Sequence, residues 1–219
     1  MHINDYILKE IKTLTLSDSV KSAKKLCKNL PITHVTVLKN NKLLGCFLES
    51  DILTIENKKS YLQEYSDLLV CFSSDKKTSL LALLKIFADN DTNIIPVLDA
   101  EKNYLGYYEL NDVLDVFANN PFLFHDGETL IIEKQKVDAS MSEVVQIVEA
   151  NNVKLLGVYI SSETNDKIQI TLKVITDEMN ELIQTFRRYD YHVITTHEDD
   201  VYLDDLKNRS DYLQKYLNM

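Results

Sequence analysis

Two segments of the chain repeat a single pattern, and this repeat constrains the fold more than any other feature of the sequence. Residues 45–53 read GCFLESDIL and residues 106–114 read GYYELNDVL. Each segment begins with glycine, continues with apolar or aromatic residues, and has an aspartate six positions after the glycine, followed by two aliphatic residues. The chain is therefore expected to contain the same structural unit twice.

The residues before each segment predict the rest of the unit. Residues 34–45 (HVTVLKNNKLLG) and 93–106 (NIIPVLDAEKNYLG) each place a polar turn between two apolar runs, which is typical of a β-hairpin. Upstream, residues 20–30 and 80–87 place apolar side chains three and four positions apart, which predicts an amphipathic helix. A short helix is expected to open at each repeated aspartate. Two units of order strand, helix, strand, strand, helix would pack together as one domain.

This pattern resembles a tandem pair of cystathionine-beta-synthase-type (CBS) domains. The second copy carries the stronger match, with IIPVLD at residues 94–99, then Leu105-Gly106 and Asp112. The first copy has Thr36 where the family usually has proline. The resemblance assigns residues 1–57 and 58–119 to the two copies. It implies that they pair through their sheets and form clefts for an adenosine-type nucleotide such as AMP, ADP or ATP.

Asp51 and Asp112 are the first candidates for ligand binding. A carboxylate at a strand-to-helix turn can accept hydrogen bonds from both ribose hydroxyls, as an acidic residue does in dinucleotide folds. The resemblance gives both aspartates this role. Ile95 and Pro96, in the best-matching strand, complete the expected contacts. A structural role is the alternative for the aspartates, because the helix dipole favours an acidic side chain in the first turn.

The sequence departs from the family three residues before each aspartate. A Ser or Thr at this position contacts phosphate or ribose in the family, whereas this chain has Leu48 and Glu109. Leu48 offers no hydrogen bond, and Glu109 places negative charge where a phosphate would lie. The glycines that begin the repeated segments, Gly45 and Gly106, are expected to allow a bend or close packing against a neighbouring strand.

The pattern changes after a linker at residues 120–128. Residues 129–200 predict the order βαββαβ, a ferredoxin-like split unit. Its first helix begins with the S-x-x-E spacing of Ser140 and Glu143, and residues 168–174 alternate between apolar and polar. This unit resembles an ACT regulatory domain, and the whole arrangement is similar to acetoin-utilisation-type regulatory proteins. Many amino-acid-binding ACT domains have a glycine in the turn after the first strand, but residues 136–140 contain none. Packing or dimerisation through the sheet is therefore the expected role.

Residues 201–219 predict a terminal helix, because Leu203, Leu206, Leu213 and Leu217 follow an a/d-like spacing. The seam is too short for an independent coiled coil. We expect this helix to dock either on its own chain or on a partner chain.

Composition excludes several classes of function. The net charge of −10 argues against binding to nucleic acids and to anionic membranes. No apolar stretch is long enough to cross a bilayer, and the first residues lack a signal-peptide pattern. The scattered cysteines, Cys27, Cys46 and Cys71, are typical of free thiols in a reducing cytoplasm. No spacing of residues indicates a metal site or a catalytic centre.

The expected fold is thus α+β, with a tandem CBS pair, an ACT-like domain and a terminal helix. The expected function is that of a cytoplasmic, non-enzymatic regulatory protein that binds an adenine nucleotide between its repeats. The alternative is a ligand-free scaffold that uses both domains for assembly and docks an unknown protein partner. A homodimer is expected from the resemblance.

Overall fold

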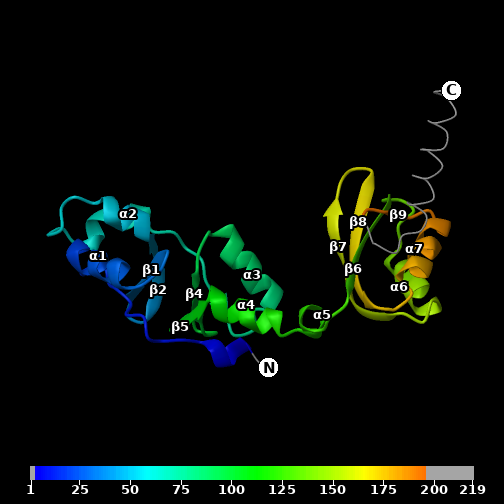
Figure 1. Cartoon of the computed structure of the whole chain (residues 1–219). Helices are drawn as coiled ribbons and strands as arrows, with labels where there is room; N and C mark the ends of the chain where they lie inside the picture. Colours follow the sequence, from blue (N-terminus) through cyan, green and yellow to red (C-terminus); the bar gives the residue numbers. More distant parts are fainter. Residues whose placement is uncertain (1–2, 196–219) are drawn as a thin grey trace, which may run out of the picture. The chain divides into compact units, whose positions relative to one another are not determined.

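The computed structural model describes residues 3–195, and the predicted terminal helix lies outside this range. The chain divides into two compact units, Met1–Asn119 and Asn120–Met219, each of mixed α+β structure. Figure 1 shows the repeated hairpins in the first unit and a larger sheet in the second.

The first repeat has the predicted helix, hairpin and helix, but the strand predicted before the helix is reduced to a single parallel bridge between Leu14 and Val37. It contains α1 (Val20–Asn29), β1 (His34–Lys39), β2 (Lys42–Leu48) and α2 (Glu49–Thr54). Ser19 caps α1, because its side chain accepts a hydrogen bond from the backbone of Ser22. The hairpin closes through Asn40 and Asn41, which adopt positive φ angles of 52° and 61°.

The second repeat has the same helix, hairpin and helix with the same cap, and it also has the predicted first strand. It contains β3 (Ser74–Asp75), α3 (Leu80–Asp89), β4 (Ile94–Leu98), β5 (Tyr104–Glu109) and α4 (Leu110–Ala118). Ser79 accepts a hydrogen bond from the backbone of Ala82, as Ser19 does in the first repeat. In both hairpins the register shifts by one residue just beyond the position opposite the repeated glycine.

A segment from outside the hairpin extends the sheet of each repeat. The N-terminal segment, after the 3-10 helix η1 (Ile3–Tyr6), pairs Leu8 with Tyr107 of β5. The connection between repeats, after the 3-10 helix η2 (Leu62–Leu68), pairs Val70 with Cys46 of β2. Figure 1 shows the blue N-terminal segment beside the second repeat. The described residues from Ile3 to Leu8 are therefore part of the second repeat's structure.

The repeated glycines allow these segments to approach closely. A Cβ atom on Gly45 would lie 2.9 Å from the Val70 carbonyl oxygen, and one on Gly106 would lie 2.2 Å from that of Leu8. Both glycines also have positive φ angles, 154° and 149°. The prediction of close packing at these two glycines is confirmed.

The helices after the hairpins begin earlier than predicted. α2 begins at Glu49 and α4 at Leu110, so Asp51 and Asp112 are third residues of their helices. The amide of Glu49 donates to the carbonyl of Thr33, and the amide of Leu110 donates to that of Asn93. These bonds to the residue before each hairpin bring the chain into the helix two residues ahead of the aspartate.

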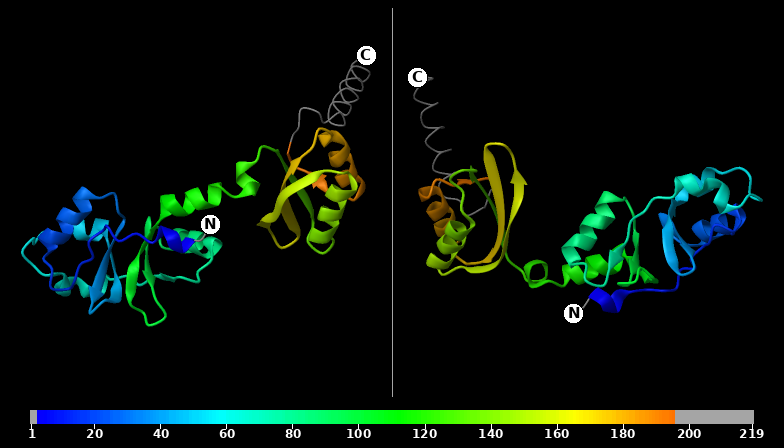
Figure 2. Two further views of the ribbon diagram at one scale, coloured as in Figure 1. Left: turned by 90° about the horizontal axis from the view of Figure 1, so that it is seen from below. Right: turned by 180° about the vertical axis from the view of Figure 1, so that it is seen from behind.

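The second unit has a four-stranded antiparallel sheet in the order β7-β8-β6-β9. Its strands and long helices are β6 (Glu128–Gln135), α6 (Met141–Ala150), β7 (Lys154–Glu163), β8 (Lys167–Ile175), α7 (Met179–Arg188) and β9 (His192–Val193). They follow the predicted βαββαβ order. Both helices cover the same face of the sheet (Figure 2) and enclose the core that includes Leu130, Leu172 and Phe186.

Two details of the second unit differ from the prediction. The expected linker contains a short helix, α5 (Pro121–Phe124), whose N-cap is Asn120. A Cβ atom on Gly157 would meet the ring of Phe122 at 2.4 Å, so glycine at this position leaves room for that ring. The last strand extends only over His192–Val193 within the described residues.

Candidate functional site

A cleft of about 170 Å3 lies at the junction of the two repeats. Residues from both repeats and from the N-terminal segment line it. They are Glu10, Ile11, Leu30, Pro31, Ile32, Asn93, Ile94, Tyr107 and Glu109. A small molecule in this cleft would contact both halves of the first unit.

The second repeat contributes part of the first repeat's core at this place. Ile94 at the start of β4 and Tyr107 on β5 are buried in the same cluster as Val35 and Phe47 of the first hairpin. The backbone of Tyr107 exchanges two hydrogen bonds of 2.9 Å with Leu8. The base of the cleft is therefore fixed by core packing and by the N-terminal segment.

Carboxylates are the charged groups of the cleft. The hydroxyl of Tyr107 donates to Oε2 of Glu10 at 3.5 Å. Burial raises the pKa of Tyr107 to about 12, and the charges of Glu10 and Glu109 act in the same direction. Glu109 is the N-cap residue of α4, but its side chain makes no capping hydrogen bond. Its carboxylate is therefore not used to cap the helix.

The four residues predicted to bind ligand have different surroundings. Asp112 lies one turn into α4, after Glu109, and does not line the cleft. Asp51 lies at the matching position of α2 in the first repeat. Ile95 is fully buried in the core of the second repeat, and Pro96 is buried beside it on β4. Only their neighbour Ile94 lines the cleft.

A ring pair occupies the matching region of the first repeat. Val70 pairs with β2 as Leu8 pairs with β5. Phe72 and Glu10 each lie two residues after these paired residues, so they occupy equivalent positions. The imidazole of His34 packs edge-on against the ring of Phe72, with centroids 5.2 Å apart. His34 occupies the position in β1 that Ile94 occupies in β4. The two repeats therefore present different side chains at equivalent positions of the junction.

His34 is uncharged at neutral pH in this environment. Its side chain is 2% exposed, and Nδ1 lies 3.0 Å from the hydroxyl of Thr33. Burial lowers the pKa of His34, whereas the carboxylates of Asp91 and Asp51 act in the opposite direction. Burial has the larger effect on this pKa, so the imidazole is neutral at pH 7.

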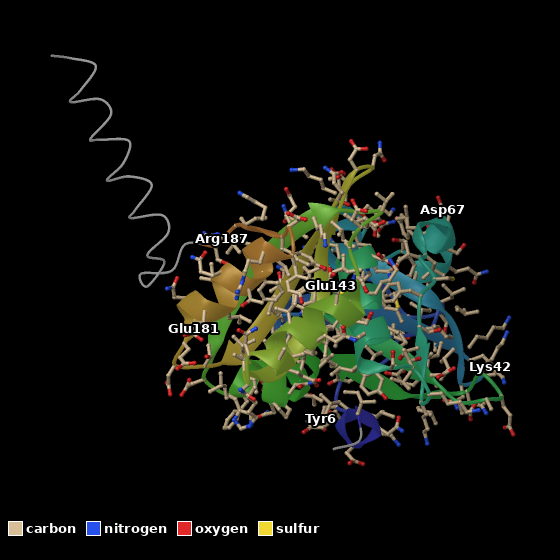
Figure 3. All side chains as sticks on the ribbon, turned by 90° about the vertical axis from the view of Figure 1, so that its right-hand side faces the viewer. Tyr6, Lys42, Asp67, Glu143, Glu181 and Arg187 are labelled. Atoms are coloured by element: carbon tan, nitrogen blue, oxygen red, sulfur yellow. The ribbon has the colours of Figure 1, made fainter. Side chains whose placement is uncertain are left out.

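Charged and polar side chains form a network at the start of α6 in the second unit, where Glu143 is labelled in Figure 3. Lys134 forms a 3.0 Å ion pair with Glu143, and the Tyr191 hydroxyl donates to the same carboxylate oxygen at 2.8 Å. The ammonium of Lys134 also lies 4.4 Å from the centre of the Tyr191 ring. Ser140 caps the helix as predicted, but the side chain of Glu143 turns to these partners. The charged and polar groups of Lys134, Glu143 and Tyr191 are thus paired with each other.

Among residues 3–195, no cluster of three or more His, Cys, Asp or Glu side chains is arranged to hold a metal ion. Within the same residues, no helix has the length and apolarity that a bilayer crossing requires.

Most of the cleft could not be predicted from the sequence. Glu10 and Ile11 carry no local motif, because they reach the cleft only through the pairing of the N-terminal segment with β5. Tyr107 stands inside the repeated segment, and its exposure of 4% follows from burial between the repeats. Its counterpart in the first repeat is Cys46. A tyrosine in one copy where the other copy has a cysteine is the sequence feature that could have indicated a role for Tyr107 at the cleft.

No family model and no curated protein matches the chain. Solved structures of CBS-domain pairs match about half of it. A CBS domain pair/ACT domain protein from Thermotoga maritima matches with a TM-score of 0.47 and 16% identity, over 53% of this chain and 96% of that one. The CBS domains of a transcriptional regulator from Streptococcus pneumoniae match with 0.46 and 15%, over 52% and 98%. CBSX2 in complex with AMP matches with 0.44 and 20%, over 53% and 95%.

Proposed function

We propose that this chain is a non-enzymatic regulatory protein whose repeated unit binds an adenosine-type ligand in the cleft between the repeats. The observation that carries the proposal is the composition of the cleft, where Leu30 and Ile32 of one repeat face a common space with Ile94 of the other. A ligand there would alter the free energy of the repeat junction. Such a ligand acts as a signal when it binds two arrangements of the junction with different affinity.

The adenosine character of the ligand follows from the resemblance to CBS domains. AMP, ADP and ATP are the compounds that this resemblance implies. Asp112, in the first turn of α4 after Glu109, is the proposed ribose partner, and Asp51 is its counterpart in the first repeat. Ile95 and Pro96 are proposed to support the same site from β4. We further propose a cytoplasmic homodimer in which the ACT-like unit provides assembly.

The second candidate function is a scaffold that binds no small ligand. Two features favour it. Neither Leu48 nor Glu109 supplies the hydroxyl that the family uses. In the ACT-like unit, the carboxylate of Glu143 at the start of α6 is already paired with Lys134 and Tyr191. The edge strand β7 also exposes Tyr159 and Ile160, which a partner could cover.

Thermal unfolding of the full chain separates the two functions. The panel contains adenosine, AMP, ADP, ATP, S-adenosylmethionine and NAD, so that phosphorylated and unphosphorylated compounds are both present. A ligand at one hundred times its dissociation constant stabilises the folded state by about 2.7 kcal/mol, which raises the unfolding midpoint. The regulatory proposal fails if no compound changes the midpoint.

Variants then locate the site. We expect Asp112→Asn and Ile94→Ala to reduce the shift, whereas Asp115→Asn, an exposed change on the same helix, leaves it intact. A shift that survives both of the first two substitutions would place the ligand elsewhere. It would leave open the regulatory function but remove the cleft from it.

A further inference from the structure

The cleft between the repeats is acidic. Glu10 and Glu109 contribute carboxylates, and no Lys or Arg is present among its described lining residues. The Tyr107 hydroxyl donates to Glu10 and lies in the field of both charges, as the raised pKa of this phenol indicates. A ligand that enters this cleft therefore meets negative charge without a compensating cation from the lining.

The remaining polar side chain in the cleft already has partners. The amide oxygen of Asn93 accepts hydrogen bonds from the backbone and the hydroxyl of Thr33, and its amide nitrogen donates to the carbonyl of Pro31. Oε2 of Glu10 accepts hydrogen bonds from the backbone amide of Lys9 and from the Tyr107 hydroxyl. Oε1 of Glu10 and the carboxylate of Glu109 are therefore the principal groups for a ligand, and ionised carboxylates only accept hydrogen bonds. The cleft therefore favours a ligand that presents hydroxyl or amino donors.

The fold itself does not require these two carboxylates. The first repeat has Leu48 at the position of Glu109, at the end of β2. It has Phe72 at the position of Glu10, because Phe72 lies two residues after Val70 and Glu10 lies two residues after Leu8. Since the same backbone accepts apolar side chains at both positions, the acidic pair is a property of one cleft and not of the architecture.

We propose that the cleft takes an unphosphorylated nucleoside and rejects the corresponding nucleotide, with Glu109 and Glu10 as the residues that determine this specificity. Apolar contact with Ile11, Ile32 and Ile94 holds the ring, and the carboxylates accept hydrogen bonds from hydroxyl or amino groups. A phosphate near the same carboxylates is repelled, because like charges placed next to each other raise the free energy of binding. This inference rests on the proposed function and narrows its ligand class.

Adenosine and AMP form the matched pair of probes, because they differ only by the phosphate. Isothermal titration calorimetry of the full chain measures the dissociation constant of each. We expect the wild-type protein to bind adenosine more tightly than AMP by about tenfold or more. Glu109→Gln and Glu10→Gln, which remove charge and keep shape, should each reduce this ratio by improving the affinity for AMP.

Glu56→Gln is the control, since Glu56 is an exposed glutamate of the same unit that does not line the cleft. It should leave the ratio unchanged, and higher ionic strength should reduce the ratio in the wild-type protein by screening. The inference is wrong if the wild-type protein binds AMP as tightly as adenosine, or if neither cleft substitution changes the ratio. In both cases the proposed function stands. The proposed function and this inference fail together only if no adenosine compound binds.

Discussion

Thr33 and Asn93 form reciprocal hydrogen bonds across the junction of the two repeats. The backbone amide of Thr33 donates to Oδ1 of Asn93 at 2.9 Å, and the backbone amide of Asn93 donates to Oγ1 of Thr33 at 3.0 Å. Each residue immediately precedes the first strand of its hairpin, so the two occupy equivalent positions. Each side chain therefore satisfies the amide that opens the other repeat's hairpin.

This reciprocity predicts that the two side chains stabilise the junction as a pair. Asn93→Ala removes the acceptor of the Thr33 amide and should lower the free energy of unfolding of the first unit by about 1–3 kcal/mol. Thr33→Val should act similarly, and the double variant should cost less than the sum of the two. Urea unfolding measures all three. Thr33→Ser, which keeps the hydroxyl, should stay near the wild-type value, and full additivity of the pair would refute the coupling.

Gly106 predicts a second effect, on the N-terminal segment. Its φ is positive, and a Cβ atom at this position would lie 2.2 Å from the Leu8 carbonyl oxygen, which leaves no room for a side chain. Gly106→Ala should cost about 2 kcal/mol or more and should accelerate hydrogen exchange of the Leu8 and Tyr107 amides, which pair there. In Gly45→Ala the added Cβ would lie 2.9 Å from the Val70 carbonyl oxygen, so this variant should lose less stability than Gly106→Ala. Equal exchange at Leu8 in both variants would show that the segment is held by other contacts.

Burial of His34 predicts a pH dependence of stability. Because the folded-state pKa is lowered, the unfolded chain takes up a proton near the ordinary pKa of 6.5 while folded His34 remains neutral. The free energy of unfolding should therefore fall as the pH decreases below about 6.5, until the folded-state pKa is passed. Urea unfolding at several pH values measures this slope.

The control is His34→Gln, whose side chain cannot take up this proton. Its free energy of unfolding should change less between about pH 7 and pH 5 than that of the wild-type protein. Phe72→Ala should admit water beside the imidazole and move its pKa back toward the ordinary value. Identical slopes in the wild-type protein and in His34→Gln would contradict the prediction.

The network at the start of α6 predicts the stability of the second unit. Burial raises the pKa of Glu143, but hydrogen bonds from Lys134 and Tyr191 outweigh this effect, so the pKa is lowered. Glu143→Gln should lower the free energy of unfolding at pH 7 by about 1–3 kcal/mol. The carboxylate contributes above its unfolded-state pKa and loses its effect as the pH falls through the folded-state value. The difference from the wild-type protein should therefore shrink in acid.

Glu149→Gln is the matched control on the same helix, because Glu149 is exposed. It should change stability little at either pH. A Glu143→Gln protein as stable as the wild type at pH 7 would mean that the desolvation of Lys134 and Glu143 cancels their attraction.

The local sequence determined the repeated elements of the first unit and the order of elements in the second. Hairpins at residues 34–45 and 93–106 and the helices after Ser19 and Ser79 depend on side chains a few positions apart, and these interactions act within one turn or one strand pair. Even the role of Gly45 and Gly106 could be predicted, since a glycine inside a strand indicates close approach of another chain segment.

The tertiary structure alone decided which side chains meet at the junction. The approach of Glu10 to Tyr107 joins residues far apart in the sequence, and it depends on the N-terminal segment extending the sheet of the second repeat. The partners of Glu143 show the same limit, because S-x-x-E spacing predicts a helix start but not the position of Lys134 on a neighbouring strand. Periodicity records which face of an element is buried, whereas the identity of the facing residue is set by how the elements pack.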